Sequence, residues 1–182
     1  HVFLKEADEK LPAFATLLQP AKTPAEFPKN KPEDLVLLIY TAGTTQWNRF
    51  CSGNLADQSA FFDTATGLGT TNKIYMTGEE NGPPFGEYGR AFAFILTGAD
   101  ANKAFELPRL GNLSFENQVA SPNSGTKTVV MMMDDTSPRG QVYMYVGDKQ
   151  ATGNDIDKAG LTNGKFYGIT VSGIVDEAAN TT

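Results

Sequence analysis

Residues 126–146, which read TKTVVMMMDDTSPRGQVYMYV, decide the fold of this chain. Residues 126–133 and 141–146 are rich in β-branched, aromatic and other apolar residues, which is typical of strands. Pro138, Arg139 and Gly140 supply the turn between them, so the stretch predicts a β-hairpin. Residues 129–133 are apolar without alternation, which predicts a strand that is buried on both faces.

The same strand pattern continues on either side of this hairpin. Further strands are predicted over residues 35–40, 73–77, 90–96, 103–107 and 165–171, each bounded by Gly, Pro, Asn or Asp. They recur roughly every 10–20 residues, which is the spacing of a sandwich or a propeller. No long helix is expected after residue 60, so the sequence predicts an all-β fold.

The N-terminal part of the chain has a different composition. Residues 1–34 are rich in Pro, Lys and Glu and predict an extended segment, with room for a short helix over residues 6–18. Residues 35–182 form the predicted β domain. A propeller blade takes about 40–50 residues and a ring needs roughly four blades, so this domain would supply about three. We therefore expect a segment of a β-propeller, part of a larger one.

The overall composition excludes several classes of protein. The chain has 182 residues, a net charge of −6 and a pI of about 4.8, which argues against a nucleic-acid partner and suits binding of divalent cations. No apolar run is long enough to span a membrane. The chain begins at His1 and not at Met, as expected of a mature form, a fragment or part of something longer.

Acidic residues follow several of the predicted strands. Glu79 and Glu80 come after residues 74–77, Glu116 after residues 113–115, and Asp134 after residues 129–133. Carboxylates gathered at strand ends are the hard oxygen ligands that divalent cations prefer. The pattern therefore predicts a cation site, which is the most distinctive chemical feature of the sequence.

Each of these acidic residues also has a simpler interpretation. Glu79 and Glu80 are adjacent, so both can reach one ion only if the chain turns there, and otherwise they belong to a solvated loop. Asp134 and Asp135 either bind a cation or cap the turn that follows them. Glu116 is either exposed to solvent or a ligand.

Other candidate functional residues are more isolated. Cys51 is the only cysteine, so it is either a thiolate ligand for iron or zinc or a small buried residue. The only histidine is His1, so a Cys/His zinc set is excluded. Arg90 and Arg109 are the candidates to contact an anion, or else they are surface ion-pair partners. The polar loop at residues 154–157 lacks the EF-hand pattern.

Several short motifs, taken in order, resemble the PhoX-type alkaline phosphatase family. They are RFCSGNL (49–55), TGLGTT (66–71), GEE (78–80), GRAFA (89–93), ELP (106–108), LSFEN (113–117), TVVMMMDDT (128–136), GQVYMYVG (140–147) and KAGLTNGK (158–165). Together they cover about two-thirds of the chain. The order and spacing carry the resemblance, since each motif alone is short.

This resemblance implies a β-propeller with metal ions in its central channel. It implies a periplasmic or extracellular phosphomonoester hydrolase that uses Ca²⁺ and Fe. By position, Cys51 resembles the iron-binding cysteine of the family, while Glu79, Glu80 and Glu116 look like its metal-binding carboxylates. Asp134 occupies a further matching position.

Two functions are expected from these observations. The first is hydrolysis of a phosphomonoester substrate, with the carboxylates and Cys51 holding the metals and with Arg90 or Arg109 steadying the phosphate oxygens. The second is a non-catalytic, calcium-stabilised propeller that acts as a binding or structural subunit. In either case, the remaining propeller segments or neighbouring subunits would be its partners.

Overall fold

The computed structural model describes residues 47–83 and 86–170, which belong to one compact unit. The predicted extended segment at residues 1–34, its helix over residues 6–18 and the strand at residues 35–40 lie outside the described residues. Within them the structure is all-β with antiparallel sheets, as predicted. No helix in this part of the chain has the length and apolar character needed to cross a membrane.

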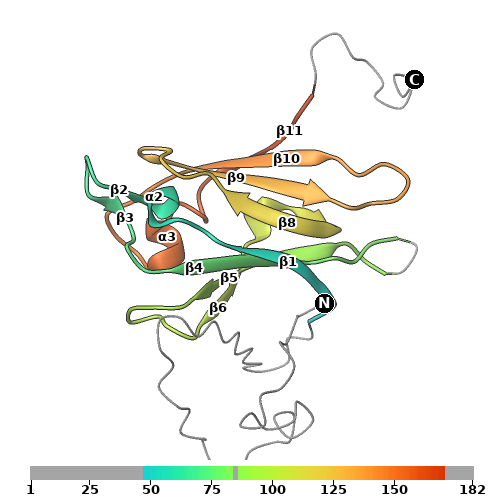
Figure 1. Cartoon of the computed structure of the whole chain (residues 1–182), viewed down its shortest axis with the longest axis horizontal. Coiled ribbons are helices and arrows are strands. Elements are labelled where there is room, and N and C mark those ends of the chain that lie inside the picture. The colour runs from blue at the N-terminus through green and yellow to red at the C-terminus, as the bar shows by residue number, and fades with distance from the viewer. Residues whose placement is uncertain (1–46, 84–85, 171–182) are drawn as a thin grey trace, which may run out of the picture. The chain divides into compact units, whose positions relative to one another are not determined.

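Eleven strands and three short helical turns make up the described structure (Figure 1). The strands are β1 (Phe50–Leu55), β2 (Phe62–Asp63), β3 (Leu68–Gly69), β4 (Ile74–Glu79), β5 (Gly89–Ile95), β6 (Ala104–Glu106), β7 (Asn112–Leu113), β8 (Phe115–Ala120), β9 (Lys127–Asp134), β10 (Val142–Asp148) and β11 (Lys165–Gly168). The helical turns are α2 (Gln58–Phe61), the 3₁₀ turn η1 (Pro108–Leu110) and α3 (Asp155–Lys158).

The strands form two main sheets that follow one another along the chain. The first sheet has the order β1-β4-β5-β6, with β7 also paired to β5, and the second has the order β8-β9-β10-β11. Strands β2 and β3 form a separate small hairpin. Figure 1 shows the two main sheets stacked, with β8 of the second sheet against β1 and β4 of the first.

The hairpin predicted from residues 126–146 is formed by β9 and β10. Its register runs without interruption from Val142 opposite Met133 to Asp148 opposite Lys127. The expectation that residues 129–133 are buried on both faces was wrong for one face. Val130 and Met132 are completely buried between the sheets, whereas the side chains that alternate with them are only half-buried. The described residues of the first sheet cover one face of β9 and leave the other open.

The core lies between the two sheets. The core residues of the first sheet include Ile74, Met76, Ala91, Ala93 and Ile95. Those of the second sheet include Phe115, Val130, Met132 and Tyr145. The first sheet also carries an aromatic cluster on its opposite face, where Trp47, Phe50, Phe92 and Phe94 make edge-to-face contacts. Both faces of the first sheet are therefore apolar.

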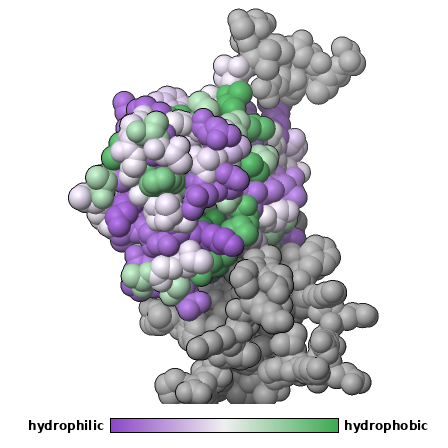
Figure 2. All heavy atoms as spheres, turned by 60° about the vertical axis from the view of Figure 1, so that its left-hand side comes forward, coloured by the Kyte–Doolittle hydropathy of each residue, from purple (hydrophilic) through white to green (hydrophobic). Residues whose placement is uncertain are grey.

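Large apolar side chains are exposed at a few places on the described part of the molecule. On the side shown in Figure 2, hydrophobic and hydrophilic residues are interspersed. The large exposed hydrophobic residues are Leu55, Tyr88, Val142, Phe166, Tyr167 and Ile169. Four of these six belong to β10, β11 or the residue after β11, so the free edge of the second sheet is the most apolar exposed region.

Three details differ from the sequence-based expectations. The described residues form one five-stranded and one four-stranded antiparallel sheet beside the small β2–β3 hairpin, and these sheets do not close into a ring. Strand β1 was not predicted, since Ser52, Gly53 and Asn54 favour turns. Glu116 does not end a strand but lies near the start of β8.

Candidate metal centre

A thiol and two carboxylates come together from three separate segments. Cys51 lies on β1, Glu80 directly follows β4, and Glu116 lies on β8. Their potential ligand atoms all lie within 4.8 Å of one another. The Cys51 thiol donates a hydrogen bond to Glu116 Oε2 over 3.4 Å. The predicted cation site therefore gathers part of the predicted set, drawn from both main sheets.

Two of these side chains project from irregularities in the strand pairing. Between Phe50 and Gly53, two residues of β1, Cys51 and Ser52, face the single residue Gly78 of β4. On β8, Glu116 is an extra residue with no partner on β9. Each irregularity is a β-bulge, which changes the direction in which a side chain points. The bulges explain how residues from both sheets reach one place.

The third residue, Glu80, is placed by the junction between the sheets. It forms an isolated antiparallel bridge with Ser114, just before β8. The exposed Arg49 guanidinium reaches its carboxylate oxygen Oε1 at 2.5 Å, and Nε lies 3.4 Å from its carbonyl oxygen. Arg49 stands two residues before Cys51. The same segment therefore supplies one candidate ligand, Cys51, and the positively charged side chain that holds a second candidate ligand, Glu80.

The environment of Cys51 favours the protonated thiol. Partial burial raises the pKa of Cys51, and its hydrogen bonds with Glu80 and Glu116 raise that pKa further. Two neighbouring carboxylates disfavour a third negative charge. A bound cation would reverse this balance, because a coordinating thiol loses its proton. The cluster is thus electrostatically suited to a positively charged ion.

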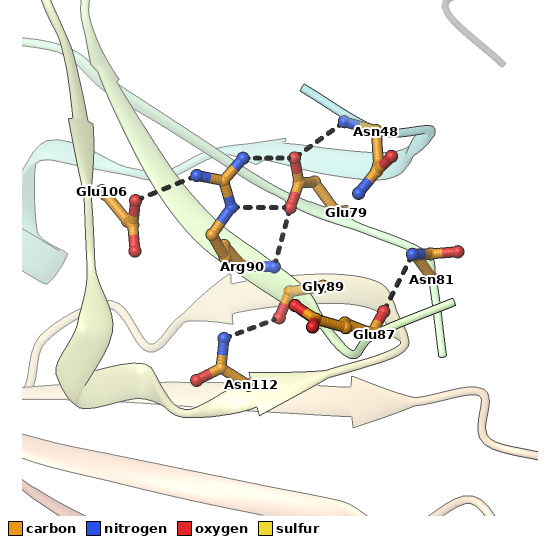
Figure 3. Close-up of polar contacts among 8 residues, drawn as sticks. All are labelled: Asn48, Glu79, Asn81, Glu87, Gly89, Arg90, Glu106 and Asn112. Atoms are coloured by element: carbon orange, nitrogen blue, oxygen red, sulfur yellow. Dashed lines mark hydrogen bonds and ion pairs between the residues drawn. The ribbon is translucent and has the colours of Figure 1, made fainter. Parts of the chain in front are cut away.

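Glu79 points away from this cluster, as expected for the neighbour of Glu80 in a strand. Its buried carboxylate accepts hydrogen bonds from Arg90 Nε at 3.0 Å and Nη2 at 2.9 Å, and from the backbone N–H groups of Arg90 and Asn48 (Figure 3). Burial would raise the pKa of Glu79, but these donors outweigh it and the pKa is lowered. Glu79 is therefore the partner of Arg90.

Asp134 adopts the turn-capping role that was its alternative interpretation. Its Oδ1 accepts hydrogen bonds from the backbone N–H of Ser114 at 3.1 Å and from Thr136 Oγ1 at 2.6 Å. It is not one of the three residues that converge. By holding Ser114, which bridges to Glu80, Asp134 supports the junction from which Glu80 projects.

Neither predicted anion-binding arginine belongs to the cluster. Arg90 is engaged by Glu79 and Glu106 and lies over the Phe92 ring, 5.2 Å from its centroid. Arg109 lies in η1, with Nη1 3.5 Å from the carbonyl oxygen of Gly164. The arginine at the cluster is Arg49, which sequence reasoning did not single out. Its proximity to the only cysteine was the available signal.

The polar loop at residues 154–157 has a structural role. Asn154 caps α3, and the Asp157 side chain completes the capping box by accepting from the Asn154 backbone N–H. The buried Asp155 carboxylate accepts hydrogen bonds from Thr70 Oγ1 at 2.7 Å and Asn72 Nδ2 at 2.9 Å. These carboxylates have protein donors, which explains them without calcium.

The chemistry of the three convergent side chains fits a transition metal. A thiolate favours iron or zinc over calcium, whereas carboxylates bind hard and borderline cations alike. Three protein ligands also match catalytic metal sites, in which a further coordination position is open to solvent or substrate. The donor set is therefore compatible with the iron that the family resemblance implies.

A groove of about 460 Å³ adjoins the cluster. Glu80 belongs to both, so the groove begins at the candidate metal ligands. The other residues lining it are Arg49, Asn81, Gly82, Pro83, Ser114, Asp135, Thr136 and Ser137. A substrate held in this groove would lie next to the cluster.

Comparisons with known proteins place the chain in no family. No protein-family model matches the sequence, and no curated protein and no solved structure is significantly similar to it.

Proposed function

We propose that Cys51, Glu80 and Glu116 bind a transition metal ion and that the chain takes part in metal-dependent hydrolysis of phosphomonoesters. The observation that carries the proposal is the convergence of these three side chains within 4.8 Å, beside a groove. The reaction class rests on the resemblance to PhoX-type phosphatases. The metal site rests on the geometry of the chain's own residues.

The residues at the cluster would contribute to metal binding in different ways. When bound, a metal ion would supply a Lewis acid that neutralises the charge of the phosphate group. Cys51 would favour iron, and the oxygen atoms of Glu80 and Glu116 would also suit Ca²⁺. Arg49 would hold Glu80 in place and bring a positive charge to the groove.

The residues around the cluster would act by positioning. The buried Glu79–Arg90 pair fixes the end of β4, the residue before Glu80. This engagement makes Arg90 a positioning residue in the proposal, and Arg109 is not among the residues that line the groove. In this proposal Arg49 binds the phosphate group, the role that the sequence suggested for Arg90 and Arg109.

We propose further that the two main sheets are consecutive blades of a larger β-propeller. Each contains a row of four antiparallel strands, β1-β4-β5-β6 with β7 added beside β5 in the first and β8-β9-β10-β11 in the second, and the two sheets pack against each other in chain order. The first strands, β1 and β8, lie in contact and carry Cys51 and Glu116. In a propeller one edge strand of every blade lines the central channel, so this arrangement would put the metal there. A periplasmic or extracellular location would accompany this function.

The test is metal content measured together with phosphatase activity. We expect the native protein to contain iron, and we expect Cys51→Ser and Glu80→Gln to lose both iron and activity. Glu87→Gln is the matched control, because Glu87 is an exposed glutamate in the same connection. Unchanged activity in Glu80→Gln after complete chelation of metal would overturn the proposal.

The non-catalytic alternative is favoured by one observation. Neither Arg90 nor Arg109 lies at the cluster, which leaves a single arginine there to bind a phosphate group. A calcium-stabilised structural propeller would contain calcium without iron, and chelation would lower its melting temperature. Iron in stoichiometric amount would exclude this alternative.

A further inference from the structure

Most of the residues that line the groove beside the cluster carry polar side chains. Apart from Gly82 and Pro83, every residue that lines it carries a hydrogen-bonding or charged side chain. Binding pockets for aromatic or aliphatic groups are lined mainly by apolar side chains. The lining therefore suits a ligand that carries many hydroxyl groups.

Two charged groups in the groove remain available to such a ligand. The Asp135 side chain is exposed and makes no polar contact with the residues that the structure describes. Arg49 is 60% exposed, and its contacts within the described chain use Nε and Nη2 while Nη1 makes none. A hydroxyl group both donates and accepts, so a polyol can donate to Asp135, and Arg49 stays free for the phosphate group.

Hydroxyl and amide groups extend this pattern. Ser137 is exposed, and Asn81 uses its Nδ2 to donate to the Glu87 carbonyl oxygen, which leaves its own side-chain oxygen as an acceptor. The Thr136 hydroxyl donates to Asp134 and keeps its acceptor capacity. The groove therefore offers both hydrogen-bond donors and acceptors.

An exposed aromatic ring, that of Tyr88, packs against Gly82, which is one of the residues that line the groove. Tyr88 is 44% exposed, and its ring packs against Gly82, where an added Cβ would come within 3.2 Å of Tyr88 Cδ1. A sugar ring presents C–H groups on its faces, and an aromatic face can pack against them. Gly82 is the position that lets the Tyr88 ring come this close to the groove.

We propose that this groove binds the alcohol half of the substrate, and that the substrates are monophosphates of sugars or other polyols. This inference rests on the proposed function, since it places the phosphate group at the cluster of Cys51, Glu80 and Glu116. Asp135, Asn81 and Ser137 then bind hydroxyl groups of the polyol, and Tyr88 packs against its carbon skeleton.

The test compares two substrates and one binding probe. With the metal-loaded protein, we expect kcat/KM for a hexose 6-phosphate to exceed that for phenyl phosphate by about tenfold or more, the discrimination that one or two hydrogen bonds provide. Asp135→Ala should lower kcat/KM for the hexose phosphate and leave that for phenyl phosphate unchanged. Asp100→Asn is the matched control, because Asp100 pairs with Lys103 beyond the far end of β5.

A direct binding measurement separates this inference from the proposed function. Saturation-transfer NMR with an unphosphorylated hexose should show contact that is reduced in Tyr88→Ala and in Asp135→Ala. Hexose binding without hydrolysis of either ester would sink the phosphatase proposal and leave the polyol site standing. Equal or better hydrolysis of phenyl phosphate, with no hexose contact, would overturn the polyol site and leave the phosphatase proposal standing.

Discussion

Glu79 and Glu80 show how neighbouring residues of one type acquire different roles. Side chains alternate between the two sides of an extended strand, so one carboxylate points into protein and the other toward the cluster. Glu79 is 1% exposed and has several donors, whereas Glu80 is only partly buried and is held by Arg49. The same Glu-Glu pair thus supplies one structural residue and one candidate ligand.

The Glu79–Arg90 pair should contribute strongly to stability. Replacing Glu79 with Gln leaves the Arg90 guanidinium without its charged partner, and we expect a loss of about 2–4 kcal/mol in the free energy of unfolding. The value is set below that of a fully buried pair because the Arg90 side chain is 27% exposed. Urea denaturation at pH 7 measures it. Glu87→Gln should change the free energy by less than about 0.5 kcal/mol, and an equal effect of both variants would contradict this role.

The same pair predicts a dependence of stability on pH. Because the pKa of Glu79 is lowered in the folded state, its contribution is present above the unfolded-state pKa, about 4.3, and is lost as pH falls through the folded-state pKa. The difference in unfolding free energy between the native protein and Glu79→Gln should therefore shrink on acidification. Parallel urea titrations at pH 7 and pH 3 test this, and a constant difference would show that the carboxylate charge does not matter.

At the scale of elements, the contact between β4 and β8 is unusually close. A Cβ added at Gly78 would lie within 2.5 Å of both Gln118 Nε2 and Phe115 Cβ, so no larger residue fits between the sheets there. Gly78 also faces the bulge that carries Cys51. The close approach therefore helps to bring β1, β4 and β8 to one place.

Gly78→Ala should separate these elements. We expect a loss of about 1–3 kcal/mol in the free energy of unfolding, typical of overpacking, together with weaker metal binding. Gly168→Ala on β11 is the matched control, because an added Cβ there meets nothing closer than 4.0 Å. Thermal melting with and without metal measures both effects. If Gly78→Ala behaves like Gly168→Ala, the packing argument fails.

The strands were predictable where their residues favour strands and pack in alternation. The β9–β10 hairpin and strands β4 to β6 followed from apolar runs bounded by turn residues. Strand β1 did not, because Ser52, Gly53 and Asn54 favour turns, and pairing with β4 overrides that preference. The strand propensities of the residues in β1 do not include the stabilisation that comes from pairing with β4.

The candidate site was predictable in composition but not in geometry. Sequence reasoning named Cys51, Glu80 and Glu116, yet it also named Glu79 and Asp134, which the structure does not bring to the cluster. A one-residue change of register decides which carboxylate points toward the cluster. The two bulges that shift the register on β1 and β8 leave no sequence signature of their own. The role of Arg49 depends on that same long-range arrangement.

At the scale of the whole molecule, the second sheet keeps an apolar outer face. Met131 pairs with Val119 on one side and with Met144 on the other, and Met144 pairs with Tyr167, so these residues form one row across four strands. Tyr167 is 44% exposed and the others are half-buried. Such a row is expected where a further sheet packs, as in the proposed propeller.

A charge placed in this row should affect association more than stability. We expect the 182-residue chain to self-associate as its concentration rises, and Met144→Lys to reduce that association while changing the unfolding free energy by less than about 1 kcal/mol. Gln141→Lys adds the same charge at an exposed neighbouring position and is the control. Sedimentation velocity measures association, and identical behaviour of native protein and Met144→Lys would contradict a covered face.

The bulge on β8 has a consequence for how the site can arise or disappear. Glu116 is the one extra residue between Phe115, opposite Asp134, and Asn117, opposite Met133. Deleting this single codon would leave a regular ladder, so the scaffold would survive the loss of a ligand. The cluster is therefore separable from the fold that carries it, because a chain with the same sheets and an uninterrupted β8 would keep the scaffold and lack one of the three candidate ligands.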